Sequence, residues 1–402
     1  MLPLNHLGTA QNHLIMRIME KWDKFSSPEW GSAKSHRQRC DGDDADVAAG
    51  ALDDGFYDAS DPSEDDLWFL PGDLVDADPA VQPGPQVDRQ NLYDIQEWQK
   101  AEAQCARSLA NLTLQVGIFI ARLGQGPAGW AQRLALREAA DLSWLAGDRV
   151  GVDRLALWRA LRLQGDADDT QELLRAGWAV RRLTDGAGPE EDLAGFLGRH
   201  APGAAEALEH QIADWHEIQR DGAGLHPITQ GALSFHTWSL TGLSEGHVLG
   251  GAAPLPLIEA AVVSARLSLG EMQIPGGATT GMFLPLALGG ARALRATGSV
   301  AERLQRWVAG AEQGVRAALR ELDAIAHWEA QTQKICTDLS GRTPQQLIKL
   351  LRDWPLVSAA MAEAQTGASR AAVQRNLALF EDRGIAREIT GQGRYRFWKA
   401  AV

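Results

Sequence analysis

The last sixty residues, 343–402, constrain the fold most, because three helical segments in them are followed by a glycine-rich hairpin. Leucines at helical spacing give the first segment an apolar face, and Pro355 ends it. The tight turn Gly367-Ala368-Ser369 separates the second helix from the third. Glycine tolerates a left-handed backbone and serine can cap the next helix. This order predicts a winged helix-turn-helix with a small β wing.

The third helix of this segment has two chemically different faces. Val373, Leu377 and Phe380 recur at the spacing of a buried helix face. The opposite face is polar at its N-terminal end, which is the end that enters a DNA major groove. Arginine and glutamine can pair with base edges through two hydrogen bonds. The predicted DNA contacts are Arg370, Gln374 and Arg375 in the major groove, with Arg394 and Arg396 of the hairpin on the DNA backbone.

The charge of the chain is divided unevenly between this segment and the rest. Residues 342–402 hold ten Lys and Arg against five Asp and Glu, whereas the remaining chain holds 29 against 47. Binding to a polyanion depends on the local field, so the net charge of −13 does not exclude DNA. One residue departs from the pattern: Glu363 stands where such motifs favour a small side chain. The alternative is a winged helix that serves only protein contacts.

Residues 91–340 carry an almost continuous helical pattern interrupted by glycine and proline, so they predict an all-α domain of many helices. Asp153 is expected to cap one helix and Pro189 to begin another. The longest predicted helix is expected to bend near Gly310 or Gly314. The predicted ranges are 92–123, 130–145, 154–163, 168–184, 189–199, 204–220, 228–240, 256–272 and 299–339.

Residues 1–90 form an acidic leader. Between residues 41 and 88 there are fifteen acidic residues, no Lys or Arg, and several prolines, a composition that favours disorder. Leu67-Trp68-Phe69-Leu70 interrupts this stretch. It predicts either a motif that docks on a protein partner or a segment that folds back on its own domain.

Several classes of protein lack support in the sequence. No apolar run is long enough to span a membrane, and no secretory signal is evident, so a cytoplasmic protein is expected. Cys40, Cys105 and Cys336 are too far apart for a CxxC site, and His210 and His216 do not share a helix face. Residues 124–129 match G-x-G-x-x-G but include a proline and follow a helix, so they predict a turn. No metal and no cofactor are expected.

Two family resemblances appear at these residues. Trp354-Pro355-Leu356-Val357, Gly367-Ala368-Ser369 and the hairpin glycines resemble the winged helix that ends many Fic proteins. Residues 133–139, 145–150 and 179–183 resemble a family, common on rhizobial plasmids, that joins a helical domain to a C-terminal helix-turn-helix. This resemblance covers residues 91–402 and implies that architecture together with DNA binding.

Fic enzymes transfer AMP with the loop H-P-F-x-[DE]-G-N-G-x-x-R, and this chain has a degenerate version that begins His226-Pro227. Gln230 stands in place of the metal-binding carboxylate, Ala232 and Leu233 replace Asn-Gly, and the arginine position holds His236. Without these groups a nucleotide triphosphate cannot be organised. The resemblance therefore predicts a chain that is not an AMP-transferring enzyme.

The sequence as a whole predicts a DNA-binding protein, a transcriptional regulator of plasmid genes, with double-stranded DNA as its partner. A homodimer through residues 299–339 is expected, since operators are usually read as two half-sites. Two alternatives stay open: a degenerate Fic-like enzyme that binds a nucleotide or modifies a protein, and a protein-interaction scaffold.

Overall fold

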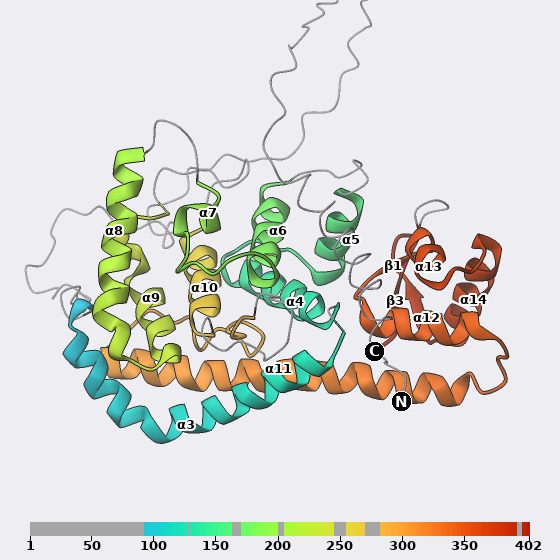
Figure 1. The fold of residues 1–402 in the computed structure, drawn as a ribbon, viewed down its shortest axis with the longest axis horizontal. Helices are drawn as coiled ribbons and strands as arrows, with labels where there is room; N and C mark the ends of the chain where they lie inside the picture. The colour runs from blue at the N-terminus through green and yellow to red at the C-terminus, as the bar shows by residue number, and fades with distance from the viewer. Residues whose placement is uncertain are drawn as a thin grey trace, which may run out of the picture. The chain divides into compact units, whose positions relative to one another are not determined.

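The computed structural model describes residues 92–127, 129–162, 170–199, 205–244, 255–269, 282–391 and 396–402. Most of these residues form α-helices, and one small antiparallel sheet lies near the C-terminus (Figure 1). The predicted fold class, a multi-helix body followed by a winged helix-turn-helix, is confirmed. The predicted acidic leader, with its apolar motif at residues 67–70, lies outside the described residues.

Two long helices, α3 (Ile95–Gln125) and α11 (Val300–Ile335), pack against each other (Figure 1). Leu112, Val116 and Phe119 of α3 are fully buried. α11 begins with a capping box, in which Ser299 accepts from the Glu302 N–H and the Glu302 carboxylate accepts from the Ser299 N–H. Such a box pairs two amides that a helix otherwise leaves unsatisfied.

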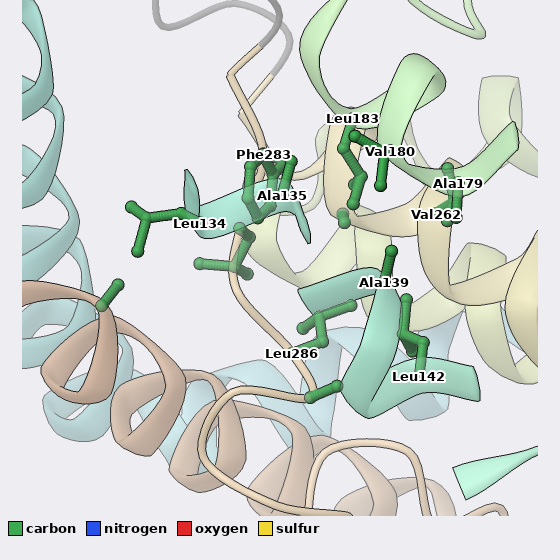
Figure 2. Packing of buried hydrophobic residues seen from close by; sticks show 14 of the residues in the cluster. Leu134, Ala135, Ala139, Leu142, Ala179, Val180, Leu183, Val262, Phe283 and Leu286 are labelled. Atoms are coloured by element: carbon green, nitrogen blue, oxygen red, sulfur yellow. The ribbon is translucent and has the colours of Figure 1, made fainter. Parts of the chain in front are cut away.

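The remaining helices of the body pack above this pair. Figure 2 shows Ala135 and Ala139 of α4 on the side of Val180 and Leu183 of α6 and Val262 of α10, whereas Leu134 points the other way; all of these side chains are buried. Burying a leucine or valine side chain contributes about 1.5–3 kcal/mol, so this layer is a main source of stability. The helices are α4 (Gly129–Leu145), α5 (Val152–Arg162), α6 (Gln171–Thr184), α7 (Leu193–Leu197), α8 (Ala205–Asp221), α9 (Pro227–Thr241) and α10 (Pro256–Leu267), with a 3₁₀ turn at Gly222–Gly224.

Two predicted helix starts are wrong. The helix expected from Pro189 begins only at Leu193, because the Asp192 side chain accepts from the Gly195 N–H at 2.8 Å and fixes the start there. Asp153 does not cap α5 but lies in its first turn, where its carboxylate is paired with Lys399. An acidic residue in a first turn still suits the positive end of the helix dipole.

The two glycines of α11 serve packing. α11 is one unbroken helix through both positions, and the bend expected there stays a prediction. A Cβ at Gly310 would overlap the Ala293 backbone, and one at Gly314 would overlap the Pro285 carbonyl. Glycine at these positions therefore lets residues 282–294 lie directly on the helix.

Glu138 of α4 holds residues 286–288, within the segment that lies on α11, through hydrogen bonds. Its buried carboxylate accepts the N–H groups of Leu286 and Ala287 at 2.8 Å and of Leu288 at 3.0 Å. Burial raises the pKa of Glu138 to about 7, although the three amide donors act in the opposite direction. One side chain thus pairs three consecutive backbone donors that would otherwise be buried without a partner.

Candidate nucleic-acid interface

The C-terminal segment folds as helix, strand, helix, helix and hairpin. α12 (Arg342–Asp353) buries Leu347, Ile348 and Leu351 and ends before Pro355, which cannot supply a backbone N–H. β1 (Val357–Ser358) leads into α13 (Ala359–Thr366), and Ser358 caps this helix by accepting from the Met361 N–H.

The turn between α13 and α14 (Arg370–Asp382) has the predicted geometry. Gly367 has φ of 65°, a left-handed conformation that costs glycine little, and its N–H donates to the Glu363 carbonyl at 2.9 Å. Ser369 caps α14 by accepting from the Ala372 N–H at 3.4 Å. These two residues set where α14 begins and its direction relative to α13.

α14 has a buried face and an exposed face, as predicted. Val373, Leu377 and Phe380 are completely buried. Arg370, Gln374 and Arg375 are exposed, and the Arg370 side chain is 74% accessible. The three predicted major-groove residues therefore lie together in the N-terminal half of the helix, accessible to solvent.

The wing is a three-stranded antiparallel sheet in the order β1-β3-β2, with β2 at Ala386–Glu388 and β3 at Phe397–Ala400. The register pairs Glu388 with Trp398. Residues 392–395, which come between β2 and β3 in the sequence, lie outside the described residues, and Arg394 is one of them.

Arg396 lies at the base of the wing among acidic and aromatic neighbours. Its Nη2 is 3.2 Å from Glu381 Oε2, its Nε is 4.0 Å from Glu388 Oε2, and its guanidinium carbon lies 4.9 Å from the centre of the Trp398 ring. The side chain remains 39% exposed. These contacts join the hairpin to the C-terminal end of α14, so any contact with DNA phosphates would compete with two carboxylates.

Buried hydrogen bonds join the winged helix to the helical body. Arg133 of α4 donates through Nη2 to the carbonyls of Trp354 at 2.9 Å, Leu351 at 3.3 Å and Arg352 at 3.5 Å. Burial lowers the pKa of Arg133, while Glu321 and Asp353 act in the opposite direction. A guanidinium at the C-terminus of α12 pairs carbonyls that have no partner within the helix.

Close packing and ion pairs complete this contact. A Cβ at Gly129 would overlap the Asp353 carbonyl, and Trp328 Nε1–H donates to the Ile385 carbonyl at 2.9 Å. These contacts could not be predicted from the sequence, because no local pattern identifies a partner 57 or more residues away. The ion pairs are Lys399–Asp153, Arg352–Glu329 and Arg383–Asp338, at 2.5, 3.0 and 2.7 Å.

The stretch that resembles a degenerate Fic loop is the start of α9. His226 caps the helix: its Nδ1 accepts from the Ile228 N–H, and its Nε2 lies 3.2 Å from Thr113 Oγ1. Gln230 donates to the Leu225 carbonyl at 2.8 Å. Gly231 lies within the helix, where a Cβ would overlap the Ser268 hydroxyl. Every one of these groups contributes to packing or capping of the body.

His236, at the arginine position of that motif, is buried between Trp98, Phe235 and Trp307. Its Nδ1 is 3.3 Å from Arg303 Nη1, and burial lowers the pKa of His236 to about 3. Across the described ranges no three His, Cys, Asp or Glu residues are arranged to hold a metal ion. No helix among the residues placed by the structure is long and apolar enough to cross a membrane.

The fold, the turn and the exposed basic face of α14 define a winged helix-turn-helix of the DNA-binding class. The family described as HTH DNA binding domain matches residues 344–400, which run from the third residue of α12 to the end of β3. No curated protein matches the chain. The DNA-binding part of the sequence interpretation is thus supported by an independent comparison, whereas the rhizobial and Fic resemblances stay predictions.

Proposed function

We propose that the chain is a transcriptional regulator that acts in the cytoplasm and binds double-stranded DNA with α14 in the major groove. The observation that carries the proposal is the placement of Arg370, Gln374 and Arg375 on the exposed N-terminal half of α14, opposite a fully buried face. A recognition helix contacts base edges with these positions and these residue types.

The three side chains are expected to contribute differently. Arg370 and Arg375 carry charge, so they attract phosphates of any sequence and can also pair with guanine. Gln374 is neutral, so it contributes to the reading of bases and little to sequence-independent binding. Arg394 and Arg396 remain proposed contacts to the DNA backbone, with Arg396 already held by Glu381 and Glu388.

The test measures fluorescence anisotropy of labelled duplex DNA titrated with the full chain across a salt series. The full chain is required because buried hydrogen bonds from Arg133 and Trp328 support the winged helix. Removing one phosphate contact (Arg375) or two (Arg375 and Arg370) lowers the magnitude of the log–log salt slope by about 0.9 to 1.8 and weakens binding at 0.1 M salt by about 8- to 60-fold. The double variant Arg370→Ala/Arg375→Ala should show both effects, and Gln374→Ala neither on mixed-sequence DNA.

The matched control is Arg292→Ala/Arg295→Ala, which removes two exposed arginines from the helical body. It changes the net charge equally and should leave the salt slope unchanged. Equal losses in both double variants would show that only net charge matters. Absence of binding by the wild type at about 50 mM salt, where phosphate contacts are strong, would contradict the proposal and favour a protein-interaction scaffold.

The proposed regulator is a homodimer, since two half-sites are usually read together. α11 offers little apolar surface for this purpose, because its apolar side chains face the protomer's own core. Leu114 and Ile118, one turn apart on α3, are 68% and 53% exposed and provide a better surface. Sedimentation should show a dimer that Leu114→Glu/Ile118→Glu dissociates and Gln305→Glu/Gln313→Glu on α11 does not. A monomeric wild type would contradict this.

We also propose that the body has no catalytic role. His226, which would be the base in a Fic-like reaction, is engaged as the cap of α9 and by Thr113. The competing reading is a body that still binds a nucleotide. A ligand of the folded state must raise its apparent stability, so a thermal shift with ATP and Mg²⁺ would favour that reading.

A further inference from the structure

Glu363 lies near the side chain of Arg370, the first residue of α14. It is on the preceding helix, α13, and its Oε1 is 3.8 Å from Arg370 Nε. Its side chain is 32% exposed, whereas that of Arg370 is 74% exposed. Among the described residues, no other acidic side chain forms an ion pair with any of the three predicted major-groove residues.

The position is one where an anion is favoured. The first N–H groups of a helix and its dipole attract negative charge, and Arg370, the first residue of α14, adds a full positive charge there. A DNA phosphate arriving at this end would meet the same groups. The Glu363 carboxylate already supplies a negative charge to Arg370, so it competes with phosphate for this side chain.

We propose that Glu363 is an internal competitor that weakens the binding of DNA phosphates to Arg370. The inference rests on the proposed function. On non-specific DNA a phosphate must displace the carboxylate in order to pair with Arg370.

The proposed role also accounts for a glutamate at position 363, where such motifs favour a small residue. A small side chain would leave Arg370 and the helix N-terminus fully available to any phosphate. The main-chain role of the position is unaffected by the side chain, because Gly367 donates to the Glu363 carbonyl. Glu363→Gln therefore removes the charge while the turn and the shape of the side chain are kept.

The test compares wild type with Glu363→Gln in the full chain, on a mixed-sequence duplex across a salt series. One additional phosphate contact steepens the log–log slope by about 0.9, which corresponds to about eight-fold tighter binding at 0.1 M salt. The control is Asp382→Asn, which makes the same change in charge on an exposed residue at the opposite end of α14. It should change the slope by much less.

A second pair of variants tests the route of the effect. In the Arg370→Ala background, Glu363→Gln should no longer tighten binding, because the cation for which Glu363 and phosphate compete is absent. An unchanged slope in Glu363→Gln, or the same gain in Asp382→Asn, would overturn the proposal while leaving DNA binding established. Absence of DNA binding in both wild type and Glu363→Gln would overturn this inference together with the proposed function.

Discussion

The buried carboxylate of Glu138 makes the stability of the fold depend on pH in a direction that can be tested. It accepts three backbone N–H groups, and its pKa is raised to about 7 from an ordinary 4.5, with burial as the cause. A raised pKa means that the folded chain binds more protons than the unfolded chain between these values. The contribution of Glu138 to stability is therefore complete below pH 4.5 and is lost as pH rises through 7.

The size of the effect follows from the shift. One pKa unit corresponds to about 1.4 kcal/mol, so the full contribution is about 3.4 kcal/mol. Between pH 8 and pH 5.5 the expected gain is about 2 kcal/mol, since the unfolded carboxyl is mostly ionised at both values. His236 acts in the opposite direction: its pKa is lowered to about 3, so it contributes stability above pH 6.5 that is lost on acidification.

The measurement that isolates Glu138 is the difference between wild type and Glu138→Gln in urea denaturation at several pH values. Glutamine keeps the shape but places an NH₂ group against a backbone donor, which costs about 1–3 kcal/mol at every pH. The advantage of wild type over the variant should shrink by about 2 kcal/mol from pH 5.5 to pH 8. A constant or growing advantage would show that the three amides keep Glu138 ionised throughout, and the reasoning from burial would be wrong.

Three further substitutions test the packing and the contact between body and winged helix. Gly117→Ala should stabilise the fold by about 1 kcal/mol, because nothing lies within 4 Å of the new methyl group on α3. Gly314→Ala should destabilise it by about 1–3 kcal/mol, since the methyl group overlaps the Pro285 carbonyl. Urea denaturation measures both changes in the free energy of unfolding. Changes of the same sign would contradict the prediction that Gly117 is open to a methyl group and Gly314 is not. Arg133→Met should cost about 2 kcal/mol and speed hydrogen exchange in α12, because the Trp354 carbonyl loses its donor; unchanged exchange would contradict this.

Local patterns predicted much of the winged helix. The spacing of Val373, Leu377 and Phe380 identified the buried face of α14, and Gly367 with Ser369 identified the turn. These features depend on residues close together in the chain, where backbone sterics and helix periodicity act directly. The exposed placement of the predicted major-groove residues followed from the same periodicity.

Features that depend on distant partners could not be predicted in the same way. A buried Glu138 looks like any acidic residue on an amphipathic helix, and only the fold brings residues 286–288 to it. The close packing at Gly310 and Gly314 could not be foreseen, because the residues that they contact, Ala293 and Pro285, come from a separate segment of irregular chain. Pro189 failed as a helix start because Asp192, three residues later, was the better cap.

The basic balance of residues 342–402 supported DNA binding from the sequence, but much of that charge is already paired. Arg352, Arg383, Arg396 and Lys399 form ion pairs at 3.2 Å or less with acidic residues. The exposed basic residues of this segment without an ion pair to a described residue are Arg342, Lys349, Arg375 and Arg387. Arg370 is also exposed and has only a weak ion pair.

These residues, with Arg394, bound the phosphate contacts of one protomer as long as the four ion pairs, including that of Arg396, stay closed. About six contacts give a log–log salt slope no steeper than about −5, whereas all ten basic residues would give about −9. A measured slope per protomer near the larger value would mean that the four ion pairs open on DNA, and the three that join the winged helix to the body would then no longer hold the two together. A slope of about −5 or shallower would mean that the body and the winged helix bind DNA as one unit.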